Sequence, residues 1–160
     1  MKIGFDVSQT AENKAGCGFL ADQLIRALVQ EYPEHEYLLY PTFYGYRHPD
    51  MRQATRPAGK HVRTLLLEES YKATCQWWDT PGLDRREKLG CPEVIHSNNF
   101  SCPHGVDAVR KIMTVYDTSF LAIPEATTEA NRPVCFQGML EASLYADHLV
   151  MISQATWERF

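Results

Sequence analysis

Short apolar runs bounded by polar or turn-forming residues recur along the chain and predict its strands. The first run, Lys2–Val7, is apolar on both faces, which is typical of a central parallel strand covered by helices on both sides. Five further runs have the length and composition of strands, and they lie at Glu36–Tyr40, Val62–Leu67, Val94–His96, Lys111–Tyr116 and Leu149–Ile152.

Helical periodicity separates several of these runs. Between the first two, apolar residues recur at i, i+4, i+7 and i+8 and predict a helix from near Gly18 to a point before Pro33. A second helix is predicted over Ser70–Leu89, broken at Pro81 and Gly82. Between the last two strands, a third predicted helix has one apolar face, formed by Phe136, Met139, Leu140 and Leu144.

The alternation of strands and helices predicts the fold class. Strands that alternate with helices form a parallel sheet with right-handed crossovers, so we expect an α/β, Rossmann-like architecture. The length of 160 residues is that of one domain. We therefore expect residues 1–160 to form a single Rossmann-like domain.

Composition limits the kinds of partner and the cellular compartment that we expect. The chain is 44% hydrophobic and 22% charged with a net charge of −4, and its Lys and Arg residues are scattered, so we expect no nucleic-acid partner. No apolar run approaches the ~20 residues that a membrane span requires, and we predict a cytoplasmic protein. Peripheral attachment to a membrane and a homo-oligomer both stay open.

The cysteines predict reduced thiols and no metal site. They are odd in number, widely spaced and without a C-x-x-C pair, which argues against a disulfide framework; they are Cys17, Cys75, Cys91, Cys102 and Cys135. The spacing of Cys91, His96, Cys102 and His104 matches none of the usual zinc patterns. We expect neither a metal nor another cofactor.

Three polar segments follow predicted strands, where ligands of open α/β sheets bind. After the first strand, Gly16 and Gly18 either let a helix N-terminus approach an anion or form a simple turn. After the fourth, His96 and the amide of Asn98 either contact a hydroxyl-rich ligand or satisfy the loop backbone. After the fifth, Asp117 is a base, a partner for a ligand hydroxyl, or a cap of the next turn.

Four segments in this order resemble the N-terminal domain of a family 4 glycosyltransferase of the GT-B fold. They are MKIGFDVSQT with GCGFLADQLIRAL, then VIHSNNFSCP, then KIMTVYDTSFLAIPE, then LYADHLVMIS. The resemblance implies a retaining transferase that moves a sugar from a nucleotide-diphosphate sugar to a small-molecule or glycan acceptor. It implies a metal-free reaction in a cleft between two Rossmann-like domains.

The resemblance also implies roles for individual residues. Gly16 and Gly18 match the loop that approaches the donor diphosphate, and the acceptor side would be lined by His96, Asn98, Phe100 and Ser119. The catalytic positions would be Tyr116 and Asp117, although the family commonly has histidine where Tyr116 stands. Tyrosine has an unperturbed pKa of ~10, so at neutral pH its hydroxyl offers hydrogen bonding rather than the proton chemistry of histidine.

The chain ends at Phe160, shortly after the sixth predicted strand. In the resembling family a second domain binds the donor, so we expect this chain to lack that domain and to have no efficient transferase activity alone. A noncatalytic binding module, or a subunit that pairs with a separate donor-binding chain, is one alternative. Another is an unrelated Rossmann-like enzyme that holds a small phosphorylated ligand at the Gly16 loop.

Overall fold

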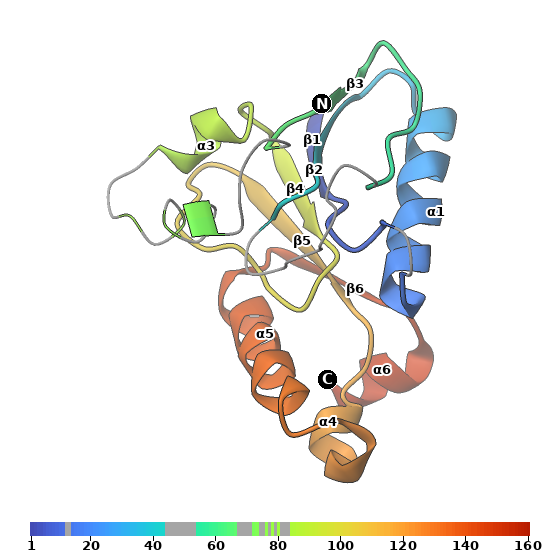
Figure 1. Cartoon of the computed structure of the whole chain (residues 1–160), viewed down its shortest axis with the longest axis vertical. Coiled ribbons are helices and arrows are strands. Elements are labelled where there is room, and N and C mark those ends of the chain that lie inside the picture. The colour runs from blue at the N-terminus through green and yellow to red at the C-terminus, as the bar shows by residue number, and fades with distance from the viewer. Residues whose placement is uncertain are drawn as a thin grey trace.

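The computed structural model describes residues 1–11, 14–43, 54–66, 72–73, 76, 78, 80 and 84–160. Within them, one parallel sheet has the strand order β3-β2-β1-β4-β5-β6 (Figure 1). The strands are β1 Lys2–Asp6, β2 Glu36–Tyr40, β3 Val62–Thr64, β4 Val94–Ser97, β5 Arg110–Val115 and β6 His148–Met151. The predicted α/β, Rossmann-like fold is confirmed.

Helices connect and cover the strands. The described helices are α1 Gly16–Glu31, α3 Arg85–Lys88, α4 Ser119–Ala122, the 3-10 turn η2 Pro124–Ala126, α5 Asn131–Tyr145 and α6 Gln154–Arg159. None of them is both long and apolar enough to cross a membrane. Part of the predicted helix over Ser70–Leu89, including its predicted break at Pro81 and Gly82, lies outside the described residues. Its last part contains α3, where Asp84 Oδ1 accepts a hydrogen bond from Glu87 N at 3.1 Å.

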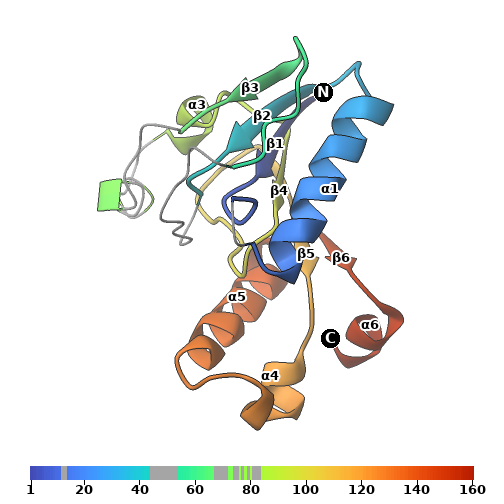
Figure 2. The same cartoon turned by 45° about the vertical axis from the view of Figure 1, so that its right-hand side comes forward.

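The two long helices lie on opposite faces of the sheet (Figures 1 and 2). Phe5 of β1 belongs to the apolar cluster that includes Ala21 and Ile25 of α1. Strand register places Met113 of β5 on the other face, where it contacts Ala142 of α5. Side chains alternate between the faces of a strand, so each long helix has its own core beneath it.

The structure shortens one predicted strand and shows which way one predicted helix faces. β3 ends at Thr64 rather than continuing toward Leu67, because Leu66 has a φ of 60°, a left-handed conformation incompatible with a strand. The apolar face predicted for α5 is mostly exposed, since Phe136, Leu140 and Leu144 are 55%, 44% and 63% exposed. The buried face of α5 consists instead of Gly138, Glu141 and Ala142.

Gly138 explains why that face packs so closely. A Cβ at this position would lie 1.7 Å from the carbonyl oxygen of Phe100, so only glycine lets α5 approach the segment that follows β4. Glu141, one turn further, accepts a hydrogen bond from Cys102 N at 3.3 Å and holds the same segment. The loop after β4 is therefore fixed against α5.

Candidate functional site

The strand order reverses between β1 and β4, and the sequence-predicted residues gather at this point. β2 and β3 lie on one side of β1, whereas β4, β5 and β6 lie on the other. In open α/β sheets, the crevice beyond the carboxyl ends of the strands at such a reversal is where ligands bind. The predicted residues all lie at or just beyond the ends of β1, β4 and β5: Gly16, Gly18, His96, Asn98, Phe100, Tyr116, Asp117 and Ser119.

A buried hydrogen-bonded network links these strand ends. His96 Nε2 lies 2.9 Å from Thr114 Oγ1, and the Thr114 hydroxyl donates to Asn98 Oδ1 at 3.1 Å. The side-chain amide of Asn98 donates in turn to the backbone carbonyl of Asp6 at 3.1 Å. Each of these groups is buried, so the chain of bonds fixes β1, β4 and β5 relative to one another.

The network determines the state of His96. Because the Thr114 hydroxyl gives its proton to Asn98, its oxygen accepts the proton of His96 Nε2. Burial lowers the pKa of His96 to about 4, so the ring is neutral at physiological pH. The ring also packs edge-on against Phe5, with centroids 5.1 Å apart. Its predicted contact with an acceptor stays a prediction, since the side chain is only 7% exposed.

Asp6, which we did not predict as a site residue, is a buried carboxylate where the loops after β1 and β4 meet. Burial raises its pKa to about 6, even though hydrogen bonds from Ser8 and from the backbone of Asn98 oppose that shift. Its Oδ1 accepts from Ser8 N at 2.9 Å and from Ser8 Oγ at 2.6 Å, and its Oδ2 accepts from Asn98 N at 3.2 Å. Asp6 therefore joins the loops that follow β1 and β4.

Tyr116 brings the third strand end into the same arrangement. Its hydroxyl lies 2.7 Å from the carbonyl oxygen of Asn98 and 3.3 Å from that of Cys17. Its ring lies 5.8 Å from that of Phe100, and its backbone carbonyl accepts from Thr156 of α6. Burial raises the pKa of Tyr116 above its usual range, so this hydroxyl acts as a donor that positions the loops.

The predicted diphosphate residues lie in the first turn of α1, because this helix begins at Gly16, two residues before the expected start. The N-cap residue, Ala15, has no side chain that could accept a hydrogen bond from the helix N–H groups. The first turn of α1 contains no acidic residue. A side chain at Gly16 would meet open space, whereas a Cβ at Gly18 would lie 2.1 Å from Gln9 O. Gly18 is thus required for close packing, and Gly16 leaves the helix terminus accessible.

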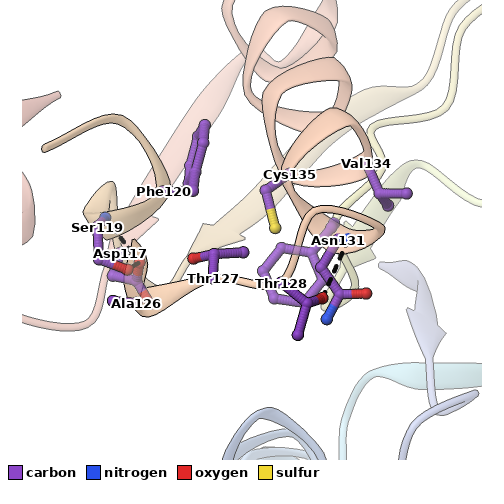
Figure 3. Close-up of a pocket in the computed structure, with 10 residues that line it drawn as sticks. Asp117, Ser119, Phe120, Ala126, Thr127, Thr128, Asn131, Val134 and Cys135 are labelled. Atoms are coloured by element: carbon purple, nitrogen blue, oxygen red, sulfur yellow. Dashed lines mark hydrogen bonds between the residues drawn. The ribbon is translucent and has the colours of Figure 1, made fainter. Parts of the chain in front are cut away.

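A cavity of about 540 Å³ opens beside the end of β5 (Figure 3). Three of the sequence-predicted residues line it: Phe100, Asp117 and Ser119. Seven further lining residues come from α4, η2, the segment that follows it and α5, and they are Phe120, Ala126, Thr127, Thr128, Asn131, Val134 and Cys135. The volume lies within the ~300–1,000 Å³ that is typical of small-molecule sites.

Asp117 is exposed at the edge of this cavity and also organises the turn into α4. Its Oδ1 accepts hydrogen bonds from Ser119 N at 2.8 Å and from Ser119 Oγ at 2.5 Å. This is the local capping that the sequence left open beside a ligand role. The second carboxylate oxygen, Oδ2, is available to accept from a ligand hydroxyl.

The structure thus separates the predicted residues into three groups. His96 and Asn98 belong to the buried network, and the half-buried Tyr116 joins it through the carbonyl of Asn98. Phe100, Asp117 and Ser119 line the cavity, and Gly16 with Gly18 begins α1. Sequence reasoning missed Asp6, although it ends a buried strand in the same way as the residues that were selected. It also missed the cavity residues of α4 and α5, which no local pattern singles out.

Among the described residues, the cysteines form no disulfide and the potential metal ligands form no cluster. Cys17, Cys91, Cys102 and Cys135 are free thiols, and Cys75 lies outside the described residues. Across the ranges that the structure describes, no group of three or more His, Cys, Asp or Glu side chains is placed to hold a metal ion.

No protein-family model matches the chain, and no curated protein sequence matches it.

Proposed function

We propose that this chain is the acceptor-side, N-terminal domain of a retaining glycosyltransferase with the GT-B fold. The observation that carries the proposal is that three of the four resembling segments meet at the strand-order reversal. Tyr116 hydroxyl lies within hydrogen-bonding distance of the carbonyl oxygens of both Asn98 and Cys17. Segments far apart in the sequence thus form one wall, as a cleft between a donor and an acceptor requires.

In this proposal the donor is a nucleotide-diphosphate sugar and the acceptor enters beside Asp117. The amides at the start of α1 would face the diphosphate, because a helix N-terminus carries unpaired N–H groups and a partial positive charge. Asp117 would accept a hydrogen bond from the acceptor hydroxyl that attacks the sugar. His96 and Tyr116 would position the loops, since both are already engaged within the network.

Efficient turnover would require a second, donor-binding domain or chain. A departing nucleotide diphosphate needs electrostatic stabilisation from several donors or cations. Lys14, the cation nearest to the start of α1 in the sequence, is paired with Asp22 at 2.8 Å.

A second candidate function is a noncatalytic module that binds the same ligands. It is favoured because the side chains of Tyr116 and His96 already hydrogen-bond within the protein.

Pyrophosphate, the shared part of all such donors, tests the proposal. We expect a titration followed by amide NMR to shift the signals of Gly16, Cys17 and Gly18 with millimolar affinity. Gly16→Asp adds a carboxylate in open space at the helix terminus and should weaken binding about tenfold. Gln23→Asp, which adds the same charge further along α1 at an exposed position, is the matched control and should bind like the parent.

Two outcomes would contradict the proposal. One is an unchanged spectrum at Gly16–Gly18 up to high pyrophosphate concentration. The other is an equal loss of binding in Gly16→Asp and Gln23→Asp, which would mean that only the net charge of the protein matters.

A further inference from the structure

The chemistry of the cavity beside β5 indicates what kind of molecule fits it. The cavity lies between Asp117, the short elements α4 and η2, and the first turn of α5 (Figure 3). Its volume of about 540 Å³ is sufficient for a monosaccharide with an attached group. The cavity is built from several elements that are themselves in contact, because α4 packs against both η2 and α5.

The charge of the lining points to an uncharged ligand. Among the lining residues that the structure describes, Asp117 is the one carboxylate, and none is Lys, Arg or His. An anionic group placed here would face a carboxylate with no cation to offset the repulsion. A neutral ligand that carries hydroxyl donors would instead complete the hydrogen bonding of Asp117 Oδ2.

The remaining lining combines apolar and hydrogen-bonding side chains. Phe100, Phe120 and Val134 supply apolar surface, and Val134 is 55% exposed. Thr127, Thr128 and Asn131 supply short polar side chains. In Figure 3 the Cys135 thiol points into the space that these side chains surround. A ligand that carries both apolar surface and hydroxyl groups matches this lining.

We propose that this cavity binds a neutral, hydroxyl-rich ligand with an apolar substituent and discriminates against anionic ligands through Asp117. The identification of this ligand as the sugar acceptor rests on the proposed function. The binding preference itself rests only on the lining of the cavity. Discrimination by charge is therefore testable without any transfer reaction.

Protection of Cys135 from alkylation measures occupancy. Phenyl β-D-glucopyranoside should slow the alkylation of Cys135 by iodoacetamide, and peptide mass spectrometry measures the rate of this reaction. The alkylation of the exposed Cys91 should be unaffected. Phenyl β-D-glucuronide has the same shape with a carboxylate in place of the hydroxymethyl group. Its half-protecting concentration should be about tenfold higher because of repulsion by Asp117.

Two substitutions test whether the carboxylate of Asp117 causes the discrimination between the glucoside and the glucuronide. Asp117→Asn keeps the oxygen that accepts from Ser119 and should reduce the difference between the two probes to less than about threefold. Asp107→Asn removes the same charge from an exposed position before β5, at the opposite end of that strand, and should leave the difference unchanged.

Equal protection by the two probes in the parent protein would overturn the inference, whatever the behaviour of the variants. So would glucoside binding that leaves Cys135 unprotected, or a loss of discrimination in Asp107→Asn as large as that in Asp117→Asn. If the glucoside protects Cys135 while pyrophosphate leaves Gly16–Gly18 unshifted, the cavity inference stands and the transferase proposal fails. The reverse result would retain the donor side and reject this inference.

Discussion

At the residue scale, burial shifts the pKa values of Asp6 and His96 in opposite directions within one hydrogen-bonded network. Burial penalises the charged form of each group, so the pKa of the Asp6 carboxyl rises to about 6 while that of the His96 ring falls to about 4. Both are tied to Asn98, Asp6 directly and His96 through Thr114. Their contributions to stability therefore change in opposite directions over the same range of pH.

Asp6→Asn and His96→Gln should separate these contributions. The native state holds the Asp6 proton more tightly than the unfolded chain, so the stabilisation of the parent relative to Asp6→Asn should fall by roughly 2 kcal/mol between pH 4 and pH 6. The native state resists protonation of His96, so stability relative to His96→Gln should rise by roughly 3 kcal/mol between pH 4 and pH 6.5.

Urea unfolding of the parent and the two variants across this pH range provides the measurement. Each variant also loses hydrogen bonds, but that loss is the same at every pH and does not change the slope. Two slopes of the same sign would show that Asp6 and His96 are not both buried as described.

At the scale of elements, α5 shows that the apolar stripe of a helix is not always its buried face. Its periodicity correctly predicts a helix, and Phe136, Leu140 and Leu144 do share a face. That face is exposed, because Gly138 and Ala142 allow the opposite side to approach the loop after β4 and strand β5. Periodicity shows which residues lie together on a helix, but it cannot show which neighbour they meet.

Two lysine substitutions in α5 distinguish the two orientations of the helix. Leu144→Lys should change the free energy of unfolding by less than about 0.5 kcal/mol, because Leu144 is 63% exposed. Ala142→Lys should cost at least about 3 kcal/mol, because Ala142 is 2% exposed and a buried ammonium would lack a partner. Chemical denaturation of both variants is the test, and a large loss in Leu144→Lys alone would reverse the assignment of faces.

At the scale of the whole molecule, the sequence predicts the topology better than the site. Strand positions and polar strand ends are local signals, and they place Gly16, His96 and Tyr116 at one end of a parallel sheet. Whether a side chain faces a ligand or the interior depends on contacts between distant segments, such as Tyr116 with Asn98 and Cys17. The cavity likewise needs α4, η2 and α5 together, so no single segment could predict it.

We propose that one end of the sheet holds a diphosphate and a neutral acceptor side by side. A crystal structure of the protein grown with pyrophosphate and phenyl β-D-glucopyranoside tests it most directly. We predict pyrophosphate within hydrogen-bonding distance of the amides of Gly16–Gly18 and the glucoside in the cavity against Asp117. Ligands bound at the amino ends of the strands, with the start of α1 and the cavity both empty, would contradict the account.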